Sequence, residues 1–108
     1  MQILPIKWDE TALQIENLGE EMFGHPVSTT YGIASFPAGV RQPAEGFVTH
    51  EGAEISFILE GEFEVETPAG ITTVKKNSLV TIPAGEPHAT KTITPGRVVY
   101  FLITENKE

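Results

Sequence analysis

The chain has 108 residues, of which 40% are hydrophobic and 20% charged, values typical of one soluble globular domain and not of a disordered or fibrous protein. Seven basic against fifteen acidic residues give a net charge of −8, which disfavours nucleic acid and anionic membrane surfaces as partners. The absence of cysteine excludes disulfides, thiolate zinc sites, iron–sulfur clusters and a cysteine nucleophile. Any bound metal must therefore have nitrogen and oxygen ligands.

The N-terminal segment, residues 1–26, carries few signals. It lacks the basic start and long apolar run of a signal peptide, and no later run approaches the roughly 18 apolar residues of a membrane helix. We therefore expect a cytoplasmic protein. Residues 9–22 have a partial apolar stripe interrupted by Gly19, which predicts a loop or short strand with at most one helical turn. His25 is expected in an exposed loop.

From residue 27 onward the sequence has the rhythm of an antiparallel β protein. Short runs rich in β-branched and aromatic residues alternate with turn signals at intervals of about eight to twelve residues. This spacing predicts a sandwich or barrel of antiparallel strands. The expected strands are 27–36, 54–60, 62–67, 71–74, 79–82, 88–93 and 97–104. We expect one domain over residues 1–108, with its core barrel at about 27–104.

Two of these strands have distinctive patterns. Residues 62–67 alternate strictly, which predicts Phe63 and Val65 inward and three glutamates toward water on an outer edge that discourages aggregation. Residues 98–103 are apolar at every position, so both faces of this strand should be covered. It is either a central strand of the barrel or a strand whose outer face meets a second subunit.

Two histidines and one glutamate occupy informative positions at strand ends. His50 and Glu54 flank Gly52, a natural turn point, and His88 follows a Pro–Gly turn where the chain re-enters a strand. If these side chains converge in an apolar barrel, they form the two-histidine, one-carboxylate set that binds divalent metals. Taken singly, each residue is more often solvated or satisfied by hydrogen bonds than bound to a metal.

The same residues resemble the two motifs of the cupin superfamily, H-x-H-x-x-x-E with a glycine seven positions later and P-x-G-x-x-H. Here the matching positions are His50, Glu54 and Gly61, then Pro83, Gly85 and His88. The resemblance spans roughly residues 36–104 and implies an all-β fold, a small antiparallel double-sheet barrel of the jelly-roll type. It also implies a metal inside the barrel and a homodimer.

The sequence departs from the cupin pattern at several motif positions. Val48 replaces the first histidine, and Gln42, Asn77 and Thr92 replace two glycines and an asparagine. Three ligands remain, so water or substrate would fill more of the coordination sphere, which suits catalysis. Gln42 is a candidate to replace the missing contact.

These residues lead to a functional hypothesis. We expect a metal-binding cupin, a small metal-dependent enzyme of oxygenase, isomerase or lyase type acting on a small organic molecule; the alternative is a non-catalytic protein that binds a small molecule or metal. Two imidazoles and one carboxylate favour manganese(II) or iron(II), with nickel, copper or zinc as substitutes. Since ligation requires neutral histidine, binding should weaken below about pH 6.

The substrate-binding residues are the least defined part of the prediction. Arg41, one of two arginines, precedes the first motif and is a candidate to hold a substrate carboxylate or phosphate, with Gln42 beside it. A surface salt bridge at the barrel mouth is the alternative for Arg41. The chain contains no nucleophile elbow, phosphate loop or dinucleotide fingerprint, which disfavours serine acyl transfer, kinase chemistry and nicotinamide redox chemistry.

Overall fold

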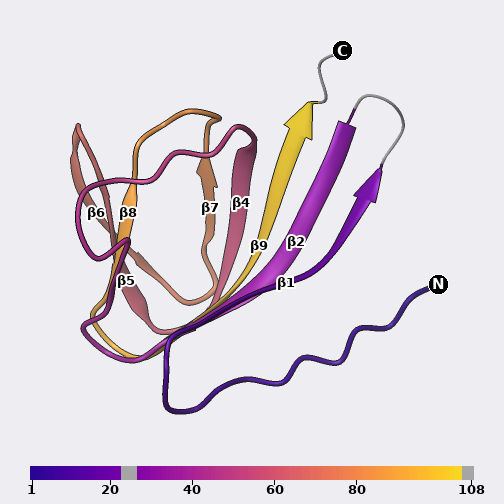
Figure 1. Ribbon diagram of the computed structural model, residues 1–108. Coiled ribbons are helices and arrows are strands. Elements are labelled where there is room, and N and C mark those ends of the chain that lie inside the picture. The colour runs from indigo at the N-terminus through magenta and orange to yellow at the C-terminus, as the bar shows by residue number, and fades with distance from the viewer. Residues whose placement is uncertain (23–26, 106–108) are drawn as a thin grey trace.

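The computed structural model describes residues 1–22 and 27–105, so His25 lies outside the described residues. Within them the chain forms two antiparallel sheets that face each other (Figure 1). One sheet has the order β1-β2-β9-β4-β7 and the other β3-β8-β5-β6. The strands are β1 (Gln14–Met22), β2 (Val27–Phe36), β3 (Arg41–Gln42), β4 (Ala53–Glu60), β5 (Glu62–Thr67), β6 (Gly70–Lys75), β7 (Leu79–Ile82), β8 (Ala89–Thr92) and β9 (Gly96–Glu105).

The all-β double-sheet architecture predicted from the sequence is confirmed. Each strand expected from residue 27 onward is present, with each bound shifted by at most one residue. Within residues 1–22 and 27–105, no helix has the length and apolar character needed to cross a bilayer.

The strand β1 is longer than the loop or short strand that we expected at its position. It pairs with β2 along its whole length, with one irregularity in register between Asn17 and Gly19. Gly19, which argued against regular structure, lets the Tyr31 ring lie across β1, because a Cβ at this position would come within 2.7 Å of Tyr31 Cζ. Gly19 pairs with Tyr31 on β2, and the sequence pattern of residues 9–22 alone does not contain this partner. The expectation of a loop or short strand therefore missed the full length of β1.

The strand β9 is central in the five-stranded sheet, which is the first of the two alternatives that its apolar sequence left open. It pairs with β2 on one side and β4 on the other. Its inner face lies against the interior space, whereas Phe101 on the outer face is 38% exposed in the single chain. A second subunit against this outer face stays a prediction.

The position of β5 differs from the outer edge that the sequence predicted for residues 62–67. Phe63 is fully buried and Val65 faces the interior, as predicted. However, β5 lies between β6 and β8, so its glutamates do not form a sheet edge. Two of them meet cations of the same sheet: Glu62 lies 3.6 Å from Lys75 on the adjacent strand β6, and Glu66 lies 3.5 Å from Arg41 on β3, beyond β8. These partly exposed pairs contribute little to stability. The edge strands of this sheet are β3 and β6.

The two sheets are joined at one end by aromatic packing. The Phe36 ring of β2 meets the Phe63 ring of β5 edge to face, with centroids 5.5 Å apart and planes at 88°. A Cβ at Gly96 would come within 2.5 Å of Phe63 Cε1, so only glycine allows the ring to approach β9 this closely. The core is therefore dense at this end of the barrel.

The N-terminal segment lies against the outer face of the five-stranded sheet. The Ser35 hydroxyl donates a hydrogen bond to the Asp9 carbonyl at 3.2 Å. Arg97 donates to Glu10 at 2.6 Å, and its guanidinium lies 5.2 Å from the centre of the Trp8 ring. These contacts hold residues 8–10 against β2 and β9, just before β1 begins.

Candidate metal site and cavity

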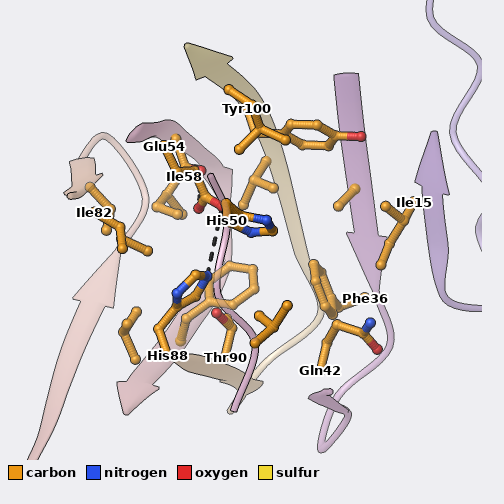
Figure 2. A pocket seen from close by; sticks show the side chains of 18 of the residues that line it. Ile15, Phe36, Gln42, His50, Glu54, Ile58, Ile82, His88, Thr90 and Tyr100 are labelled. Carbon is orange, nitrogen blue, oxygen red and sulfur yellow. Dashed lines mark hydrogen bonds and ion pairs between the residues drawn. The ribbon is translucent and has the colours of Figure 1, made fainter. Parts of the chain in front are cut away.

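Three predicted ligands converge on the interior face of the barrel (Figure 2). Glu54 lies near the start of β4, His50 lies in the preceding turn, and His88 directly precedes β8. Glu54 Oε1 is 3.3 Å from His50 Nε2 and 3.8 Å from His88 Nε2. One ligand atom from each of the three residues lies within 4.8 Å of the others. The sequence motifs thus identified residues that the fold brings together.

Backbone pairing explains why His88 points inward. His88 forms an isolated antiparallel bridge with Val48, with N···O distances of 2.9 and 3.0 Å between their backbone groups. This bridge holds the backbone of His88 in place just before β8 begins. The His88 side chain is 5% exposed. The His50 side chain, which is 31% exposed, lies closer to solvent.

Two hydrogen bonds orient the ligand atoms. His88 Nδ1 lies 2.9 Å from the Glu86 carbonyl oxygen, and because a carbonyl only accepts, Nδ1 carries the hydrogen. In the neutral imidazole, the Nε2 lone pair then faces Glu54. The Ser56 hydroxyl donates to Glu54 Oε2 at 2.9 Å, which leaves Oε1 directed at the histidines.

This arrangement places two lone-pair donors, His88 Nε2 and Glu54 Oε1, opposite each other. A neutral His88 and an ionised Glu54 repel each other unless a proton or a cation lies between them. Two ligand atoms each about 2.1 Å from an ion lie about 3.0 Å apart at a right angle, so the observed separations need only small side-chain rotations to fit a divalent metal. The donor set therefore fits a metal of the type bound by two imidazoles and a carboxylate.

The ligand group lies in the wall of a cavity of about 300 Å³ between the two sheets. This volume is at the lower end of the range of about 300–1,000 Å³ for small-molecule sites. Most lining side chains are apolar and come from both sheets. They include Ala34, Phe36, Ile58, Val65, Val80 and Leu102.

A second polar pair lies in the same cavity wall. The Tyr100 hydroxyl donates to Asn17 Oδ1 at 2.6 Å, joining β9 to β1 across β2. Gly32 makes this reach feasible, because a Cβ there would overlap the end of the Tyr100 ring. Burial raises the pKa of Tyr100, and the nearby carboxylates of Glu54 and Glu16 raise it further, so its hydroxyl remains a donor at neutral pH.

The two predicted substrate-binding residues have different environments. Gln42 lines the cavity. Arg41 donates from Nη1 to the Pro43 carbonyl at 2.9 Å, lies 3.5 Å from Glu66, and has its guanidinium 5.9 Å from the centre of the Phe47 ring. These contacts correspond to the salt-bridge alternative, and the substrate role of both residues stays a prediction.

Sequence reasoning missed Ser56 and Asn17. Ser56 carries a signal in retrospect, since it lies two residues after Glu54 on the same strand and must face the same side. Asn17 carries no such signal, because its position in the cavity depends on the pairing of β1 with β2.

The fold and the site together define a small double-sheet barrel with a histidine–glutamate–histidine group in its interior. The Cupin domain family model matches residues 34–104, and the chain belongs to this family. No curated protein matches.

Solved structures with similar folds include distant cupins. A cupin superfamily protein from Desulfitobacterium hafniense has a TM-score of 0.71 at 16% identity, over 93% of this chain and 84% of that one. A conserved Streptococcus pyogenes protein of unknown function has a TM-score of 0.70 at 17% identity, over 92% and 80% of the respective chains. The DMSP lyase DddQ from Ruegeria pomeroyi has a TM-score of 0.60 at 29% identity, over 68% of this chain but 37% of that one.

Proposed function

We propose that this cupin binds a divalent metal through His50, Glu54 and His88 and acts as a small metal-dependent enzyme on a small organic molecule in the adjoining cavity. The convergence of three ligand atoms within 4.8 Å carries this proposal. The hydrogen bond from His88 Nδ1 to Glu86 supports it, because it directs the remaining imidazole nitrogen toward the same point.

The donor set favours manganese(II) or iron(II), with nickel, copper and zinc as substitutes because affinity generally rises along that series. When bound, such an ion supplies a Lewis acid that polarises an oxygen of the ligand. The apolar cavity wall excludes bulk water from the ligand, and Ser56 holds the carboxylate in place. Oxygenase, isomerase and lyase reactions all fit this arrangement, and the similarity to a DMSP lyase supports the lyase type.

The second candidate function is non-catalytic binding of a small molecule or the metal itself. Among the described residues that line the cavity, the titratable ones are His50, Glu54, His88 and Tyr100. If the first three hold a metal, only Tyr100 remains, and its raised pKa keeps the hydroxyl protonated at neutral pH, so it cannot accept a proton as a general base. A screen of small molecules that detects a ligand but no product, with oxygen uptake followed in parallel, would favour this candidate.

Metal analysis of protein purified without an affinity tag tests the proposed site. We expect stoichiometric metal in the wild type and loss of metal in His50→Ala, Glu54→Gln and His88→Ala. Glu51→Gln is the matched control, since Glu51 lies beside the site in sequence but is exposed. Metal-free wild type that gains no thermal stability from added manganese or iron would refute the proposal, and undiminished metal in one variant would remove that residue from the site.

A further inference from the structure

The cavity has a second polar end besides the metal group, formed by Asn17 of β1 and Tyr100 of β9. Figure 2 shows the Tyr100 ring extending from β9 with its hydroxyl directed away from Glu54. Asn17 is exposed and Tyr100 is buried, so the pair lies where the cavity wall meets solvent. Its position requires Gly32 beneath the ring.

The pair offers hydrogen bonds of both kinds. Asn17 accepts from Tyr100 through Oδ1, and its amide still has two N–H donors. The Tyr100 oxygen donates its hydrogen to Asn17 and keeps lone pairs that can accept. A hydroxyl, carbonyl or amide group of a ligand can therefore be recognised there without a charge.

The rest of the cavity offers nothing to balance a second charge on a ligand. Among the described lining residues there is no lysine or arginine, and the single carboxylate is Glu54. Once Glu54 ligates a metal, no charged side chain of either sign in this lining remains for the far end of a ligand. A second ionised group would keep only the water that reaches it past Asn17, and an ionised group that loses its water without gaining a partner is disfavoured.

We propose that the ligand is a small, mainly apolar molecule with one oxygen at the metal and one uncharged hydrogen-bonding group at the Asn17–Tyr100 pair. This inference rests on the proposed function for its metal end. Under this proposal, hydroxy and keto compounds fit the cavity. Dicarboxylates, phosphate esters and amino acids do not, because their second charge has no partner there. It also assigns Asn17 and Tyr100 as specificity-determining residues.

A matched series of linear carboxylates tests this inference with manganese-loaded protein. Each probe presents one carboxylate to the metal and differs at its other end, which is a methyl, a hydroxyl, a second carboxylate or an ammonium group, at chain lengths of four to eight carbons. Dissociation constants are measured by calorimetry for the wild type, Asn17→Leu and Tyr100→Phe. Glu20→Gln is the control, because Glu20 lies on the same strand as Asn17 but is exposed and does not line the cavity.

At the best chain length, we expect the hydroxyl probe to bind about fivefold more tightly than the methyl probe, the effect of one net hydrogen bond. We expect the dicarboxylate and the amino acid to bind at least tenfold more weakly than the hydroxyl probe. The fivefold preference should fall to about onefold in Asn17→Leu and Tyr100→Phe and persist in Glu20→Gln.

Three results would overturn the inference while leaving metal binding intact. These are equal or tighter binding of a doubly charged probe, a hydroxyl preference that survives in both variants, and no binding of any probe to protein with stoichiometric manganese. Tyr100→Phe retains the ring and keeps the test decisive if Asn17→Leu fails to fold. Protein that takes up no manganese contradicts the proposed function itself and removes the basis of the inference with it.

Discussion

Replacing Ser56 with alanine should weaken metal binding without changing any ligand. The Ser56 hydroxyl, 7% exposed, donates to Glu54 Oε2 at 2.9 Å, and the variant frees Glu54 to rotate away from His50 and His88. A hydrogen bond to a charged group contributes about 1.5–3 kcal/mol. At 1.4 kcal/mol per tenfold, this is a loss of about 10- to 100-fold in affinity, the range found for groups that orient metal ligands.

The assay is competition for manganese between the protein and a chelator of known affinity. Ser35→Ala is the matched control, because Ser35 is also 7% exposed and donates a hydrogen bond, but to the Asp9 carbonyl on the outer face of the sheet. It should lower stability and leave the manganese affinity within about twofold. An unchanged affinity in Ser56→Ala, or an equal loss in both variants, would refute the assigned role of the Ser56 hydroxyl.

Three further predictions concern the core, the metal and the tyrosines. Phe63→Ala should lower the free energy of unfolding by about 3–5 kcal/mol in urea titrations, since the ring is fully buried; a loss below 1 kcal/mol would contradict the packing described. Bound metal should be retained at pH 7.5 and released below about pH 6 in equilibrium dialysis, because protonated imidazole cannot ligate; full retention at pH 5 would count against histidine ligation. Burial raises the pKa of both Tyr31 and Tyr100, aided by Glu21 and Glu54 respectively, so absorbance at 295 nm should show ionisation above pH 10 in the folded protein. Because the pKa of each tyrosine is higher in the folded protein than in the unfolded chain, the tyrosines stabilise the folded protein at a pH below their pKa in the unfolded chain. This stabilisation is lost as the pH rises above 10; ionisation of either tyrosine at or below pH 10 would contradict this.

Local patterns were sufficient to predict the seven strands expected from residue 27 onward and the three side chains that the fold brings together. The alternation of residues 62–67 identified Phe63 as buried, and the spacing of His50, Glu54 and His88 identified a group that the barrel assembles. Both signals are short-range, because alternation determines which face a side chain occupies and motif spacing places ligands at strand ends.

The features that local patterns did not reveal depend on which strands pair. The interior position of β5 requires β8, which lies over twenty residues later in the chain. The full length of β1 and the meeting of Asn17 with Tyr100 require β2 and β9 to lie side by side. Arg41 likewise meets Glu66 through the arrangement of the second sheet. Such contacts join residues remote in sequence, and no pattern within one strand encodes them.

The central position of β9 has a consequence for how the protein is made. The strands β2 and β4 do not pair with each other, and β9 alone joins them in the five-stranded sheet. Because β9 follows every other strand along the chain, this sheet cannot close until residues 96–105 have emerged from the ribosome. Until then β1 with β2 and β4 with β7 can form only separate pairs, with the apolar cavity walls open to solvent. The cavity and its ligands therefore assemble after synthesis of the barrel is nearly finished, in a slow step dominated by non-local contacts.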